Sequence, residues 1–234
     1  LLSRRQRQMC IRDRLSEETV AWMKTQLEEA KKQGVTVIPV SHHNLLDEST
    51  LYPEECTIEN TKEVTALLEA YGVPVYLSGH LHLQRIKKHT SNLNTPGGYG
   101  IREIVTSPLP MAPCQYSILN WQTDGSLSYH TKKVDIAGWA QRYGEEDENL
   151  LNFDAYADQF LVDVISKQAF KALQSASKDI KEEMARLYAD MNRDYCSGTK
   201  IDVAKIRKSE AYQYWIRYLS LIHISEPTRL ALIS

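Results

Sequence analysis

The sequence predicts an α/β sheet flanked by helices and followed by an all-helical region, and three observations lead to this fold class. Two short apolar runs, 35–40 and 73–77, each follow an amphipathic helical stretch. Alternating runs on either side of Asp124-Gly125 come next, which is typical of antiparallel strands joined by a tight turn. Beyond an acidic stretch at 144–148, only helical periodicity remains.

The first half of the chain contains two helix–strand units. Ser16 is a favourable N-cap for a first helix, and Gly34 ends it before the strand predicted at 35–40. A second helix over 58–71 leads to the strand at 73–77. Because both apolar runs are nearly continuous, we expect their strands to be buried on both faces. Ligand sites in such sheets lie at the carboxyl ends of the strands.

The second half changes from strands to helices. A polar strand at 84–88 is followed by three strands that we expect to form a β-meander, over 101–106, 115–121 and 127–134. Three amphipathic helices are predicted beyond the acidic stretch, and they should form a small bundle. These helices cover 150–173, 178–195 and 201–218.

The two ends of the chain resemble translated sequencing-library adapters. Met9 to Asp13 can be encoded by a string whose reverse complement encodes Leu219 to His223, and unrelated protein termini have no reason to be related in this way. We therefore exclude 1–14 and 219–234 from the fold prediction. The domains expected between them are a first at 15–140 and a helical second at 141–218.

Excluding the ends changes the charge of the protein. The full chain has a formal net charge of −2, and five arginines against one aspartate give residues 1–14 a charge of +4, which leaves −6 on the rest. This excess of negative charge gives no basis for sequence-independent nucleic-acid binding. The remaining cysteines, at 56, 114 and 196, are scattered and form no metal-binding pattern. No apolar run is long enough to suggest a membrane span, and cytoplasmic and exported locations both stay open.

Histidines follow both predicted strands of the first half. Ser41-His42-His43-Asn44 follows 35–40, and Ser78-Gly79-His80-Leu81-His82 follows 73–77. Because neutral imidazole nitrogens bind zinc, manganese and iron, two strand ends that bring histidines together predict a metal site.

The order of these motifs resembles the C-terminal half of a calcineurin-like metallophosphoesterase. In that family a β-sandwich flanked by helices binds two metal ions, and this sequence matches its last two motifs, a lone histidine after a strand and Gly-His-x-His. The resemblance implies that His42 and His80 bind one metal and His82 the other, the two ions being manganese, iron or zinc. His43 and Asn44 are candidates for contact with substrate or for supporting the ligands. The helical tail resembles the C-terminal domain of bacterial cyclic-nucleotide phosphodiesterases of the same superfamily.

The resemblance implies a phosphoric ester hydrolase, in which a metal-bridging hydroxide attacks phosphorus in line. The substrate expected is a small phosphodiester such as a cyclic nucleotide. The carboxylate- and asparagine-bearing motifs of the family are absent, and with them the acid that protonates the leaving group, so the catalytic residues are unknown here. We therefore expect this chain to be a fragment that binds metal poorly and is inactive alone.

Three alternatives remain open from the sequence. The first is a phosphomonoesterase of the same superfamily. The second is a metal amidohydrolase, which also uses His-x-His but needs further strand–helix units where this chain has a meander and helices. The third is a non-catalytic interaction module whose histidines are incidental.

Overall fold

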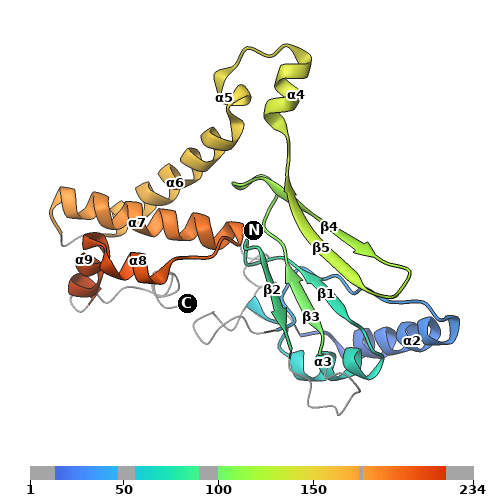
Figure 1. The fold of residues 1–234 in the computed structure, drawn as a ribbon. Helices are drawn as coiled ribbons and strands as arrows, with labels where there is room; N and C mark the ends of the chain where they lie inside the picture. The colour runs from blue at the N-terminus through green and yellow to red at the C-terminus, as the bar shows by residue number, and fades with distance from the viewer. Residues whose placement is uncertain (1–13, 47–55, 90–99, 174–175, 220–234) are drawn as a thin grey trace, which may run out of the picture. The chain divides into compact units, whose positions relative to one another are not determined.

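The computed structural model describes residues 14–46, 56–89, 100–173 and 176–219, which form two compact units (Figure 1). The first unit ends at Thr106 and the second begins at Ser107. We expected a boundary near residue 140, but the β-hairpin that we assigned to the first domain groups with the helices.

Two helices of the first unit pack beside a sheet. Helix α2 (Glu17–Gln33) begins at Ser16, whose hydroxyl accepts a hydrogen bond from Thr19 N (3.1 Å), and it ends at Gly34 with φ 66°. Both helix ends were predicted, because a serine N-cap and a left-handed glycine are local signals. Helix α3 (Thr61–Ala70) is shorter than the predicted 58–71. The core between helices and sheet includes Leu27, Val64, Leu68, Val73, Tyr76 and Ile101.

The sheet of the first unit has the strand order β1-β3-β2. Strand β1 (Val75–Ser78) pairs in parallel with β3 (Arg102–Val105), and β2 (Arg85–Lys88) pairs with β3 antiparallel. The β-meander prediction was wrong for β3, which pairs with the strands that precede it. The last three residues of β3 are all buried, and that burial suits a central strand covered on both faces.

The predicted strand at 35–40 was also wrong in its burial and extent. Only Val40 forms a β-bridge, parallel to Leu77, and the side chains of Val35 and Val40 are 56% and 73% exposed. Pro39 has no backbone N–H, which shortens the pairing that this segment can make. The segment nevertheless runs parallel to β1 at its end, and that alignment brings the two histidine segments together.

The second unit begins with an isolated β-hairpin. Strand β4 (Gln115–Trp121) pairs with β5 (Leu127–Lys133) across the predicted turn, where Asp124 Oδ1 accepts a hydrogen bond from Ser126 N (2.9 Å). Gln115 Nε2 donates to Ser197 O (3.1 Å) at the end of a helix of the same unit. This bond explains in part why the hairpin belongs with the helices.

The rest of the second unit is helical, as predicted. Its core includes Met184, Ala185 and Trp215, and the indole Nε1 of Trp215 donates to Met184 O (3.0 Å). None of the helices in the described ranges is long and apolar enough to cross a membrane. The helices are α4 (Ile136–Tyr143), α5 (Glu148–Leu151), α6 (Phe153–Ala172), α7 (Lys178–Ser197), α8 (Val203–Lys208) and α9 (Glu210–Leu219).

The predicted single helix over 201–218 is two helices separated at Ser209. The backbone of Ser209 is extended, and its hydroxyl accepts a hydrogen bond from Tyr212 N (3.2 Å), which starts α9. A serine side chain offers the backbone this alternative to a continuous helix. Helical periodicity alone did not reveal the break.

Candidate functional site

The histidines lie in two turns that run side by side in the first unit. Leu77 N donates to Pro39 O, and Ser41 N donates to Leu77 O, both at 3.0 Å. One step further, Gly79 N donates to His42 O (3.1 Å). The parallel alignment therefore continues past the strand ends into the turns, which we call the first turn (41–46) and the second turn (78–82).

Three imidazoles gather where these turns meet. The nearest nitrogens are His42 Nε2 and His80 Nδ1, which are 3.1 Å apart. The ring centre of His80 lies 5.0 Å from that of His42 and 4.1 Å from that of His43. The sequence predicted that His42 and His80 would meet. His43 joins them as a third ring.

The second turn adopts an unusual backbone conformation. His80 and His82 have φ values of 61° and 56°, and Leu81 N donates to Gly79 O (2.7 Å). Left-handed backbone at a residue other than glycine costs on the order of 1 kcal/mol or more, and such residues cluster at functional sites. The two left-handed residues curl the chain, and His82 is left exposed at the end of the curl.

The spacing of the two nitrogens fits two ligands of a single metal ion. Metal–nitrogen bonds of roughly 2.0–2.1 Å at angles between about 90° and 110° place two ligand nitrogens about 2.9–3.4 Å apart. The 3.1 Å between His42 Nε2 and His80 Nδ1 falls within that range. Among the described residues, however, no three or more histidine, cysteine or acidic side chains form a group that could hold a metal ion. The described residues thus offer part of a metal site, in which two imidazole nitrogens have the spacing of two ligands of one ion.

The two remaining candidates, His43 and Asn44, are more buried than His42 and His82. Asn44 is fully buried, and its Nδ2 donates to Ser78 Oγ (3.0 Å), so its amide connects the two turns. The Nε2 of His43 is also shielded from solvent. Because both groups are shielded, they are better placed to support the neighbouring histidines than to contact a substrate.

Sequence reasoning missed Glu103, a fully buried carboxylate in the central strand β3. Its oxygens accept hydrogen bonds from Ser78 Oγ (2.6 Å) and from the backbone nitrogens of Leu45 and Leu46 (both 2.7 Å). A signal was present, because Glu103 is the acidic residue inside the apolar run 101–106. A charge in a buried strand requires several hydrogen-bond donors, and these come from both histidine turns.

Tyr76 supports the first turn from strand β1. Its hydroxyl donates to Ser41 Oγ (2.7 Å), next to His42. Burial raises the pKa of Tyr76, and the negative charge of Glu103 raises it further, against the lowering effect of the bond to Ser41. The phenol therefore remains a hydrogen-bond donor at neutral pH.

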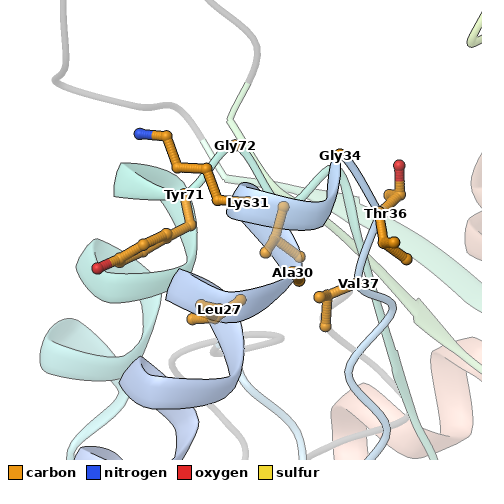
Figure 2. Close-up of a pocket in the computed structure, with 10 residues that line it drawn as sticks. Leu27, Ala30, Lys31, Gly34, Thr36, Val37, Tyr71 and Gly72 are labelled. Atoms are coloured by element: carbon orange, nitrogen blue, oxygen red, sulfur yellow. The ribbon is translucent and has the colours of Figure 1, made fainter.

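A cavity of about 260 Å³ lies elsewhere in the first unit, between the ends of α2 and α3 (Figure 2). It is lined by Leu27, Val37 and the chain around Gly34 and Gly72, with Lys31 at its edge. None of the histidines lines it. The cavity therefore does not belong to the histidine site.

The comparison with protein families concerns the second unit. Residues 135–225 match the model of a family described as the C-terminal domain of cyclic nucleotide phosphodiesterase. The helical region is therefore related to a phosphodiesterase domain, in agreement with the resemblance of the helical tail noted from the sequence. The matched range includes residues 219–225, which we had assigned to adapter sequence. The chain matches none of the curated proteins.

Proposed function

We propose that this chain is the C-terminal part of a metal-dependent phosphodiesterase of the calcineurin-like superfamily. The single observation that carries the proposal is the combination of a phosphodiesterase-related helical domain at 135–225 with two imidazole nitrogens 3.1 Å apart. A phosphodiesterase parent makes the substrate a small phosphoester, and the family match favours a cyclic nucleotide.

His42 and His80 would hold one metal ion through Nε2 and Nδ1, and His82 would serve the second ion. When bound, two cations polarise a phosphoryl oxygen and lower the pKa of a bound water, which supplies the hydroxide expected to attack phosphorus. The chain's own contribution is to present the two imidazoles together on turns that are hydrogen-bonded to each other. The carboxylates of a dinuclear site would come from the upstream motifs of the parent protein.

Metal titration of this chain tests the ligand assignment. We expect Co²⁺ to bind weakly, with the electronic spectrum of a nitrogen-bound ion, and we expect His42→Ala or His80→Ala to abolish that binding. His130→Ala is the matched control, because His130 is an exposed histidine on β5 of the second unit. Loss of binding in all three variants, or binding in none of the proteins, contradicts the assignment and favours an interaction module.

The product of the complete gene tests the activity. We expect it to hydrolyse cyclic AMP and bis(p-nitrophenyl) phosphate in the presence of Mn²⁺, and we expect His80→Ala to abolish turnover. Faster turnover of p-nitrophenyl phosphate than of the diester would favour the phosphomonoesterase alternative. Reading the upstream coding sequence for the carboxylate- and asparagine-bearing motifs of the family is a test that needs no protein.

A further inference from the structure

We infer that Glu103 is a positioning residue that sets the distance between the two metal-binding imidazoles. The inference rests on the proposed function, because it assigns Glu103 a role in the metal site without direct contact to the metal or the substrate. It starts from the position of Glu103, which is 0% exposed and lies in the central strand of the sheet.

The carboxylate of Glu103 is bonded to both histidine turns at once. On the first turn, Oε1 accepts from Leu45 N and Oε2 accepts from Leu46 N, each at 2.7 Å, two and three residues after His43. On the second turn, Ser78 Oγ donates to Oε1 (2.6 Å), two residues before His80. One rigid strand residue therefore fixes the two turns relative to each other.

The amide of Asn44 closes the same network. Its Nδ2 donates to Ser78 Oγ (3.0 Å) and more weakly to Glu103 Oε1 (3.4 Å). Asn44 and Ser78 are both buried, so each of these bonds lies away from water, where loss of one partner leaves a polar group unsatisfied. The backbone bond from Gly79 N to His42 O is a separate connection between the turns, and it does not orient the chain after His43.

The network requires a carboxylate and not merely a polar side chain of the same shape. Both oxygens of Glu103 accept from backbone N–H groups, so the –NH₂ group of a glutamine would face an N–H donor in either orientation. Glu103→Gln must therefore displace Leu45 or Leu46, and with it the turn that carries His42. Groups that orient metal ligands typically change metal affinity by about 10–100-fold when they are altered.

The test compares Glu103→Gln with Val64→Ala in the 234-residue chain. Val64 is fully buried in the core cluster that also includes Leu45 and Leu46, but it makes none of the hydrogen bonds of the network. This control therefore matches the loss of core packing without removing a bond to Glu103. Long-range ¹H–¹⁵N spectra of the imidazoles report the geometry of His42 and His80 without metal. Co²⁺ titration reports their function as a pair.

We expect Glu103→Gln to shift the imidazole resonances of both His42 and His80 and to weaken Co²⁺ binding by at least about tenfold. Val64→Ala should leave the resonances in place and the affinity within about twofold. Ser78→Ala is a second variant, which removes both bonds of the Ser78 hydroxyl, to Glu103 and from Asn44, and keeps the bonds of Glu103 to Leu45 N and Leu46 N. It should therefore shift His80 more than His42. It keeps the test decisive if Glu103→Gln does not fold.

Resonances in Glu103→Gln or in folded Ser78→Ala that match those of Val64→Ala would overturn the positioning role, even if His42→Ala abolishes Co²⁺ binding. Failure of the unaltered chain to bind Co²⁺ through His42 and His80 would overturn the proposed function instead. In that case the metal-free imidazole spectra still decide whether Glu103 positions the two turns.

Discussion

Truncation of Trp215 should unfold the helical part of the second unit under mild conditions. Trp215 is 1% exposed, lies in the core formed by α6, α7 and α9, and donates its indole N–H to Met184 O (3.0 Å). A buried tryptophan removes roughly 150–250 Å² from water, which at about 25 cal/mol per Å² corresponds to about 4–6 kcal/mol. Because alanine retains part of this burial, we expect Trp215→Ala to lower the free energy of unfolding by about 3–5 kcal/mol.

Two further variants separate burial from hydrogen bonding. Trp215→Phe keeps most of the apolar surface but loses the bond to Met184, so it should lower the free energy of unfolding by about 1 kcal/mol from that bond, plus a smaller packing term. Trp139→Ala is the control, because Trp139 lies on α4 and is 45% exposed. This variant should change the free energy of unfolding by no more than about 0.5 kcal/mol.

Urea unfolding followed by circular dichroism at 222 nm measures these changes, because the second unit contains most of the described helix. With a slope of about 1–3 kcal/mol per molar urea, Trp215→Ala should lower the midpoint by at least about 1 M. A midpoint for Trp215→Ala within experimental error of Trp139→Ala would refute the assignment of Trp215 to the core.

Three further predictions concern a helix cap, the thiols and the activity of the chain. Asp135 Oδ1 caps α4 by accepting a hydrogen bond from Gly138 N (2.8 Å), and a Cβ at position 138 would collide with that carboxylate. Gly138→Ala should therefore not give the gain in stability of about 1 kcal/mol that alanine usually has over glycine in a helix. In an Asp135→Ala background, which itself costs about 1 kcal/mol, Gly138→Ala should recover stability in urea; a gain of equal size in both backgrounds would contradict the collision. Burial raises the pKa of the Cys114 and Cys196 thiols, so both should react more slowly with iodoacetamide at pH 8 than in urea, as read by peptide mass spectrometry. Because the unfolded thiols ionise at a lower pH, near roughly 8.5, their contribution to stability is present below that pH and is lost as the pH rises through the raised pKa values of the folded thiols. Equal alkylation rates in the folded and unfolded chain would contradict the raised pKa values. Finally, residues 15–218 alone should show no metal-dependent turnover of bis(p-nitrophenyl) phosphate, since the described part of the chain places no acidic side chain in a metal-binding group with the histidines; measurable turnover would refute the expectation.

Local signals accounted for the elements that were predicted correctly. Ser16 and Gly34 mark the ends of α2, and Asp124-Gly125 marks the turn between β4 and β5, because caps and tight turns depend on side chains within a few residues. The break at Ser209 is equally local, but a serine within an amphipathic pattern is compatible with a helix as well as with a cap.

Strand pairing was less predictable. Strand β3 looked like the start of a meander, yet it lies between β1 and β2, and the hairpin that follows belongs to another unit. Alternation along a strand indicates which face is buried, but it does not identify the partner strand. That choice depends on burial across residues that are distant in sequence.

The sequence by itself determined the two histidine motifs and, through the order of helices and strands, the expectation that His42 and His80 lie together. Only the tertiary structure decided how they meet, with Nε2 and Nδ1 3.1 Å apart, the tilted ring of His43 beside His80, and His82 left exposed. It also identified Glu103, whose bonds to Leu45, Leu46 and Ser78 span gaps of up to 58 residues along the chain. Residue types and spacing can predict which side chains are available for chemistry. The network that holds them in place depends on contacts between distant segments, and these exist only when the chain is folded.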